Sequence, residues 1–160
     1  MPPLDPRVHI GHVHLTVSDL DRSLAFYRDV LGFEVTTRYG REAVFLSAGG
    51  YHHHIGLNTW AGRGAPAPPP GTTGLYHFAI LYPDRNTLAA AVRRVLQANI
   101  LLEGAADHGV SEAIYLRDPD GNGVELYRDR PEPEWPRAPD GTVVMGTKPL
   151  DLEKLLAEGT

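Results

Sequence analysis

The sequence contains no cysteine, no basic cluster and no long apolar run, and each absence excludes a class of function. Without cysteine there is no disulfide bridge, thiol nucleophile or zinc–thiolate site. Asp and Glu (20) outnumber Lys and Arg (15), so nucleic acid and anionic membranes, which bind clustered basic residues, are not expected as partners. No stretch approaches the roughly 18 apolar residues of a membrane span, and MPPLDPR does not resemble a signal peptide, so we expect a cytoplasmic protein.

Histidine is the informative residue type that remains. The 160 residues, 42% hydrophobic and 22% charged, have the composition of an ordinary soluble globular domain. Eight residues are histidine, and three of them form the run His52, His53 and His54 within a strand-like segment. Where thiolates are absent, imidazole and carboxylate are the natural protein ligands for a metal of intermediate softness.

The first half of the chain predicts the order β-α-β-β-β. Residues 8–17 alternate apolar and polar positions, which favours a strand. A helix follows, with Ser18 or Asp19 as its N-cap and Gly32 at its C-terminal end. One face of this helix carries Leu20, Leu24, Tyr27 and Leu31. Three shorter strands are expected at roughly 33–39, 42–48 and 51–60.

The same order restarts after a Pro/Gly-rich linker at residues 61–73. A strand at 74–82 precedes a helix that Asp84 caps and that extends to about Ala98. Strands are expected at 100–104, 111–118 and 123–129. The C-terminal extension, residues 131–160, is predicted to hold a short strand near 142–147 and an amphipathic helix near 150–158.

The two halves repeat with a fixed offset. His12 and His77 differ by 65 (77 minus 12), and so do the helix caps Asp19 and Asp84 (84 minus 19). A long period seen twice indicates duplication of one supersecondary unit. We therefore predict an α+β fold in which two βαβββ modules, about 8–60 and 74–128, form a curved mixed sheet around a metal site within a domain of residues 1–130.

Duplication places His12 and His77 at equivalent points, where pseudo-twofold packing lets their rings converge. Glu125, in the predicted last strand, is the most natural third ligand. Two imidazoles and one carboxylate leave open coordination positions and suit non-haem Fe(II). Mn(II), Co(II), Ni(II) and Zn(II) are the alternatives for the same donor set.

Three segments, GHVHLTVSDLDRSLAFYRDVLGFEV, GLYHFAI and YLRDPDGNGVELYRDRP, resemble the vicinal oxygen chelate superfamily. It includes glyoxalases, bleomycin-resistance proteins and extradiol ring-cleaving dioxygenases. The resemblance covers about residues 8–130 and is strongest to members similar to catechol 2,3-dioxygenase. It implies paired βαβββ modules around a metal held by His12, His77 and Glu125.

The predicted fourth strand, in HHHIGLNTW, separates the members of this superfamily. Glyoxalase-I-like members place a second carboxylate where this sequence has Gly56, and glycine cannot bind a metal through its side chain. Extradiol dioxygenases carry a catalytic acid/base histidine slightly upstream. Alignment places His53 there, whereas strand alternation favours His54, so both remain candidates and His53 ranks first.

The last hairpin, HGVSEAIYLRDPDGNGVELY, resembles the extradiol pattern of a His, a Tyr and a ligand Glu. Tyr115 lies ten residues before Glu125, as that pattern requires, and His108 lies slightly closer to Tyr115 than it does in the pattern. The resemblance implies that His108 and Tyr115 hydrogen-bond a deprotonated catechol oxygen, while His53 or His54 moves protons.

The sequence favours an extradiol-type dioxygenase that acts on a small catechol-like aromatic and O₂. Two alternatives are a metal-dependent lyase, isomerase or thiol transferase of the same superfamily, and a bleomycin-resistance-type binding protein. Each candidate catalytic residue also has a purely structural interpretation. The histidine run can be a solvated strand face, Tyr115 a core aromatic and His108 an ordinary loop residue. The linker lets the modules pair within one chain or exchange between two, so a homodimer is one arrangement that the sequence allows.

Overall fold

The computed structural model describes residues 2–158, which form two compact units. The first unit ends at Pro66 and the second begins at Ala67. This boundary lies inside the Pro/Gly-rich segment that the sequence marks as a linker, and no helix or strand occurs between residues 59 and 77. The division into a domain of residues 1–130 and an extension stays a prediction.

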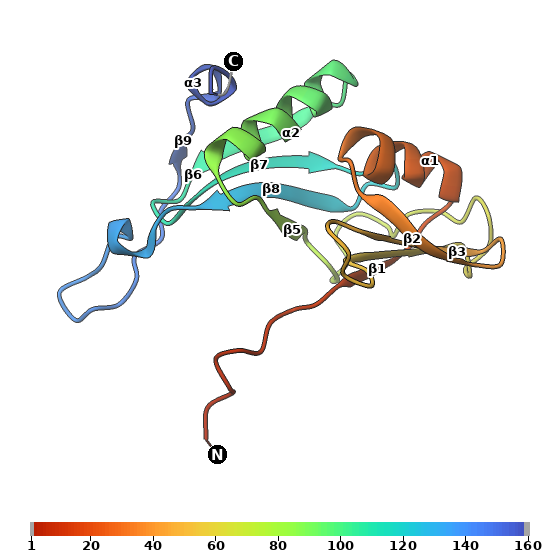
Figure 1. The fold of residues 1–160 in the computed structure, drawn as a ribbon, viewed down its shortest axis with the longest axis horizontal. Coiled ribbons are helices and arrows are strands. Elements are labelled where there is room, and N and C mark those ends of the chain that lie inside the picture. The colour runs from red at the N-terminus through yellow and green to blue at the C-terminus, as the bar shows by residue number, and fades with distance from the viewer. Residues whose placement is uncertain (1, 159–160) are drawn as a thin grey trace. The chain divides into compact units, whose positions relative to one another are not determined.

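The first unit is a four-stranded sheet with one helical segment on its face (Figure 1). Its elements are β1 (Val13–Thr16), α1 (Leu20–Leu24), the π-helix η1 (Ala25–Val30), β2 (Glu34–Tyr39), β3 (Ala43–Ser47) and β4 (Ile55–Asn58). The strand order is β1-β4-β3-β2, with β1 parallel to β4 and the other neighbours antiparallel. Asp19 is the N-cap of α1 and accepts a hydrogen bond from the Arg22 N–H.

The second unit repeats this arrangement and adds a C-terminal segment. Its elements are β5 (Phe78–Leu81), α2 (Arg85–Gln97), β6 (Leu102–Asp107), β7 (Ser111–Arg117), β8 (Gly123–Asp129), the 3-10 helix η2 (Glu132–Glu134), β9 (Lys148–Pro149) and α3 (Leu152–Leu156). The strand order is β5-β8-β7-β6-β9, and β5 is parallel to β8 just as β1 is parallel to β4. The predicted α+β class and the order βαβββ, repeated twice, are confirmed.

The core of the second unit forms where α2 lies along its sheet (Figure 1). The buried face of α2 carries Leu88, Ala89, Ala91, Val92 and Val95. From the sheet, Ile114, Leu116 and Leu126 are at most 1% exposed. This face fixes which side of β7 and β8 is buried, because successive side chains of a strand point to opposite faces. Tyr115 and Glu125 therefore belong to the opposite face.

The opening strands are shorter than predicted. β1 starts at Val13 because its pairing with β4 starts there, at Val13 opposite Ile55. His12 therefore lies one residue before β1, and His77 lies one residue before β5. The equivalence that the sequence predicted for these two histidines is thus retained, although neither lies within a strand.

The strand predicted at 51–60 begins only at Ile55, so the histidine run precedes it. The Thr36 hydroxyl donates to the His52 carbonyl at 2.8 Å. That carbonyl is therefore not available for a hydrogen bond to the backbone of a neighbouring strand. The ladder resumes at His54, whose N–H donates to the Leu46 carbonyl at 2.8 Å.

The strand predicted near 142–147 is wrong, and the helix predicted after it is confirmed as α3. Only an isolated bridge joins Arg137 to Val143. Val144 and Met145 are 45% and 68% exposed, so this apolar run belongs to a loop, and the short strand β9 follows it. No helix within residues 2–158 has the length and apolar character needed to cross a bilayer.

Candidate metal centre

His77, one residue before β5, lies close to Glu125 of β8 because β5 and β8 pair in parallel. Glu125 lies in β8 opposite Ala79, and Ala79 is two residues after His77 in the sequence. His77 Nε2 lies 2.9 Å from Glu125 Oε2, and these side chains are 31% and 12% exposed. An imidazole nitrogen and a carboxylate oxygen, two ligand types that bind a divalent metal, are thus brought together at one partly buried point.

Imidazole and carboxylate are donor types that suit a divalent metal. His77 Nδ1 is buried and has no hydrogen-bond partner, so contacts within the protein leave part of this imidazole unsatisfied. Among residues 2–158 no three His, Asp or Glu side chains form a group that could hold a metal. His12 belongs to the first unit, whereas His77 and Glu125 lie together in the second. The set of all three ligands therefore stays a prediction.

Tyr115 and His108 extend this pair into a connected row. Tyr115 lies directly opposite Glu125 in the antiparallel pairing of β7 with β8, and its hydroxyl is 3.3 Å from Glu125 Oε1. His108, in the turn between β6 and β7, places Nε2 2.7 Å from the same hydroxyl. Four of the predicted site residues, His77, Glu125, Tyr115 and His108, are therefore contiguous.

The Tyr115 phenol is held in its protonated form. Burial, followed by the nearby charge of Glu125, raises the pKa of Tyr115 to about 12. At neutral pH this group is therefore an O–H donor in the metal-free protein. A phenol in this position can donate a hydrogen bond to an oxygen of a bound ligand.

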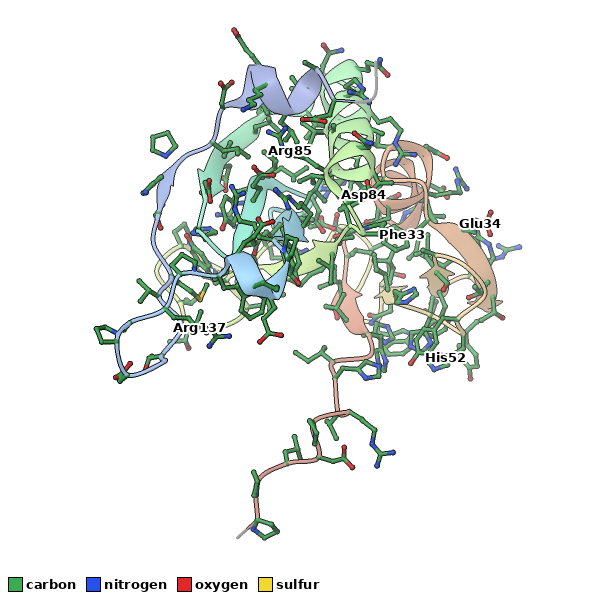
Figure 2. All side chains as sticks on the ribbon, turned by 60° about the vertical axis from the view of Figure 1, so that its left-hand side comes forward. Phe33, Glu34, His52, Asp84, Arg85 and Arg137 are labelled. Atoms are coloured by element: carbon green, nitrogen blue, oxygen red, sulfur yellow. The ribbon has the colours of Figure 1, made fainter. Side chains whose placement is uncertain are left out.

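In the first unit, His53 lies against His12. Their ring centroids are 4.3 Å apart, and the Phe45 ring is 5.1 Å from His53. His52 Nδ1 lies 2.7 Å from His53 Nδ1, and Figure 2 labels His52 in this group of rings. Burial, together with positive charge on neighbouring histidines, His12 first, lowers the pKa of His53. The His53 imidazole is therefore neutral at neutral pH and can act as a base.

His54 points to a different partner. The Ala48 N–H donates to His54 Nδ1 at 3.2 Å, and the Ser47 hydroxyl is 3.0 Å from the same nitrogen. This ring is thus bound at the end of β3, whereas His53 contacts His12. The geometry supports ranking His53 ahead of His54 as the acid/base candidate, and both assignments stay predictions.

Sequence reasoning gave no role to His14, whose ring covers Gly56. A Cβ on Gly56 would lie 2.9–3.0 Å from three ring atoms of His14. The ring also contacts Phe45 and Trp60, at centroid distances of 5.6 and 5.5 Å. The space beside Gly56 that a side chain would fill is therefore occupied by an imidazole, an arrangement that the parallel pairing of His14 with Gly56 produces.

A protein-family model described as the Glyoxalase/Bleomycin resistance protein/Dioxygenase superfamily matches residues 9–126. A catechol-2,3-dioxygenase of Bacillus subtilis strain 168 is 46% identical over 94% of this chain and 52% of its own length. Biphenyl-2,3-diol 1,2-dioxygenase 3 of Rhodococcus globerulus is 35% identical over 75% of this chain and 63% of its own length. The chain thus spans less than two thirds of either relative.

Further relatives differ in the metal or reaction that their names state. One is a manganese-dependent 2,3-dihydroxybiphenyl 1,2-dioxygenase of Geobacillus genomosp. 3, 30% identical over 82% of this chain and 39% of its own length. Another is an iron-dependent extradiol dioxygenase of Rhodococcus jostii, 27% identical over 73% of this chain and 42% of its own length. The crystal structure of a lactoylglutathione lyase from Agrobacterium tumefaciens aligns with a TM-score of 0.59 and 29% identity, over 78% of this chain and 96% of that chain.

Proposed function

The chain belongs to the Glyoxalase/Bleomycin resistance protein/Dioxygenase superfamily, and on that premise we propose that it is an extradiol-type ring-cleaving dioxygenase for a small catechol-like aromatic. The observation that carries this proposal is the row formed by His77, Glu125 and Tyr115 with His108 at its end. It joins candidate metal ligands directly to a phenol donor and an imidazole. A cytoplasmic location and a homodimer are part of the proposal.

His12, His77 and Glu125 would hold the metal. Fe(II) and Mn(II) are the leading ions, because relatives named iron-dependent and manganese-dependent both occur, while Co(II), Ni(II) and Zn(II) bind the same donor types. A bound redox-active divalent ion would supply Lewis acidity toward the catechol and a redox centre for its reaction with O₂.

The chain's own residues would then manage protons and orientation. His53, neutral at neutral pH, accepts a proton from a catechol hydroxyl. Tyr115 keeps its proton up to a pKa of about 12, and when an aromatic ligand is bound its hydroxyl can turn from His108 and donate to the deprotonated catechol oxygen. His108 orients the Tyr115 hydroxyl through their 2.7 Å contact.

The second candidate is a metal-dependent lyase, favoured by the alignment with the solved lactoylglutathione lyase. Gly56 argues against its glyoxalase-I form, since His14 fills the space where a fourth-strand carboxylate would project. A bleomycin-resistance-type binding protein is the third candidate, and such a protein needs no imidazole–carboxylate pair.

The test is anaerobic loading of the full chain with Fe(II) or Mn(II), followed by O₂ and a panel of catechols. Ring opening produces a yellow product, and bound metal is measured by elemental analysis. We expect His77→Ala and Glu125→Ala to lose both metal and product. Tyr115→Phe should keep the metal and lower kcat. Metal binding without ring opening favours the lyase, and a chain that binds no metal favours the binding protein.

A further inference from the structure

The loop before β9 returns to His108, and Gly146 contacts it through both main-chain groups. The Gly146 carbonyl oxygen lies 2.8 Å from His108 Nδ1. The Gly146 N–H donates to the His108 carbonyl at 3.1 Å. This residue, 38 positions along the chain from His108, therefore binds both the ring and the backbone of the histidine that ends the site row.

The chemistry of these partners decides which ring nitrogen carries the proton. A carbonyl oxygen only accepts hydrogen bonds, so a 2.8 Å contact requires His108 Nδ1 to carry hydrogen. In the neutral ring, Nε2 then has a free lone pair. The Thr147 hydroxyl also approaches Nδ1, but its distance of 3.4 Å makes this contact weaker than the one to the Gly146 carbonyl. It therefore does not determine which nitrogen carries the hydrogen.

The His108 tautomer in turn directs the single proton of Tyr115. That proton has two acceptors, His108 Nε2 at 2.7 Å and Glu125 Oε1 at 3.3 Å. A bare Nε2 at the shorter distance takes it, so the Glu125 oxygen keeps its lone pairs. If Nε2 carried hydrogen instead, the Tyr115 hydroxyl would turn toward Glu125 and compete with a metal for that oxygen.

The C-terminal segment is anchored on both sides of Gly146. Before it, the Trp135 indole N–H donates to the Arg130 carbonyl at 2.7 Å. After it, β9 pairs with β6, with Lys148 opposite Asp107, and Leu155 of α3 is fully buried. A cavity of about 410 Å³ lies beside His108, and Gly146 also lines it. The carbonyl that meets His108 is therefore held by folded structure.

We propose that Gly146 is a positioning residue whose main chain fixes His108 as the Nδ1–H tautomer, and so keeps the Tyr115 proton off the candidate ligand Glu125. The effects on turnover and on metal affinity rest on the proposed function, whereas the tautomer does not. The C-terminal segment thereby completes the candidate site through backbone atoms.

The first test is a long-range ¹H–¹⁵N NMR spectrum of the metal-free full chain at about pH 8, above the ordinary histidine pKa of about 6.5. Signals that vanish in His108→Gln identify this residue. Free imidazole side chains in water favour the Nε2–H form, and we expect His108 in the Nδ1–H form. A His108 ring that carries hydrogen on Nε2, alone or with Nδ1, overturns the proposal.

The second test is Mn(II) titration of variants. Gly146→Pro removes the N–H bond that holds Gly146, and with it its carbonyl, against His108. We expect about tenfold weaker Mn(II) binding, the size of effect seen when support for a metal ligand is lost. Gly146→Ala should retain the Nδ1–H form, because no atom lies within 4 Å of the added Cβ. In a Tyr115→Phe background the Tyr115 proton is absent, so the His108 tautomer no longer affects Glu125 and Gly146→Pro should then leave the affinity unchanged.

A Gly146→Pro loss that persists in the Tyr115→Phe background means a general structural defect and overturns the proposal. A wild-type affinity for Gly146→Pro also overturns it. The proposed function fails in a different way, when no catechol is opened by the metal-loaded chain. An Nδ1–H ring together with rescue by Tyr115→Phe upholds the inference even in that case.

Discussion

At the scale of single residues, two glycines leave space that a neighbouring histidine and its backbone occupy. Gly123 opens β8, and a Cβ there would overlap the Tyr76 carbonyl oxygen and lie 2.9 Å from the Cβ of His77. At Gly56 the obstacle to a Cβ is instead the side-chain ring of His14, 2.9–3.0 Å away. The obstacle at Gly123 is backbone, which yields less readily than a side chain.

Gly123→Ala is therefore expected to displace the backbone before β5 and move His77 away from Glu125. We predict about tenfold weaker Mn(II) binding, measured by titration, the size of effect seen when support for a metal ligand is lost. Gly104→Ala is the matched control, because its added Cβ meets only Tyr115, at an ordinary 3.9 Å. Wild-type affinity in Gly123→Ala would show that this glycine does not position His77.

Gly56→Ala is expected to lower the free energy of unfolding by about 1–2 kcal/mol, a typical cost of overpacking. The cause is the contact of 2.9–3.0 Å between the new Cβ and the His14 ring. In a His14→Ala background that contact is absent, so adding Gly56→Ala should cost close to nothing. Urea denaturation of the four proteins measures this coupling, and equal costs in both backgrounds would contradict it.

Local signals predicted part of the candidate site. The ten-residue spacing of Tyr115 and Glu125 spans a tight turn, so two antiparallel strands bring them opposite each other. The turn is fixed by Asp118, whose carboxylate accepts from the Asn122 N–H at 2.8 Å. Gly146 could not be found this way, because its contact with His108 depends on how a loop folds back over 38 residues.

At the scale of elements, sequence periodicity predicted the two ends of the helix that follows β1 but not its π-helical part. The cap at Asp19 and the end at Gly32, whose φ is 88°, agree with the prediction. The helix continues as the π-helix η1, in which the Leu31 N–H donates to the Phe26 carbonyl. The wider turn buries Phe26 as well as Tyr27, which a regular 3.6-residue period would not place on one face.

The cap of α2 links an element to the pH dependence of stability. Hydrogen bonds from the Thr87 N–H and then its hydroxyl lower the pKa of Asp84. Because the pKa of Asp84 is lower in the folded state, the Asp84 carboxylate stabilises the fold at pH values above its unfolded-state pKa of about 3.9. This stabilisation is lost as the pH falls through the folded-state pKa.

Asp84→Asn is expected to retain the cap, since Asn caps as well as Asp, and to remove this titration. Urea unfolding at a series of pH values should give a shallower loss of stability below about pH 4 for Asp84→Asn than for the wild type. Asp140 caps no helix, but the Thr142 N–H lowers its pKa too, so by the same linkage Asp140→Asn should also give a shallower acid slope. An unchanged acid slope in Asp84→Asn would contradict the linkage.

At the scale of the whole chain, duplication explains what the sequence could predict. The offset of 65 between His12 and His77 and the repeated βαβββ order were readable because helix caps, turns and strand patterns recur in the same order along each module. The C-terminal segment has no counterpart in the first module. Its place depends on pairing between β9 and β6 and on a network of charges, which periodicity does not reveal.

That network centres on Glu112, a β7 residue that is 4% exposed. Its carboxylate accepts from Arg128 Nε at 2.8 Å, Arg85 Nε at 3.0 Å and Arg130 Nη2 at 3.3 Å. Arg85, at the beginning of α2 (Figure 2), also binds Glu158 beyond α3. One buried carboxylate thus connects the sheet, α2 and the C-terminal end of the described chain.

Glu112→Gln should therefore lower the free energy of unfolding by about 3 kcal/mol, because three guanidinium groups lose their shared anion in a mostly buried setting. Glu103→Gln is the matched control: its pair with Arg117 is about half exposed and should contribute under about 1 kcal/mol. Urea denaturation measures both. Equal, small losses would mean that solvent already screens the network. A large loss for Glu112 alone, with faster amide exchange at Gly146, would mean that the same carboxylate keeps the C-terminal segment on His108.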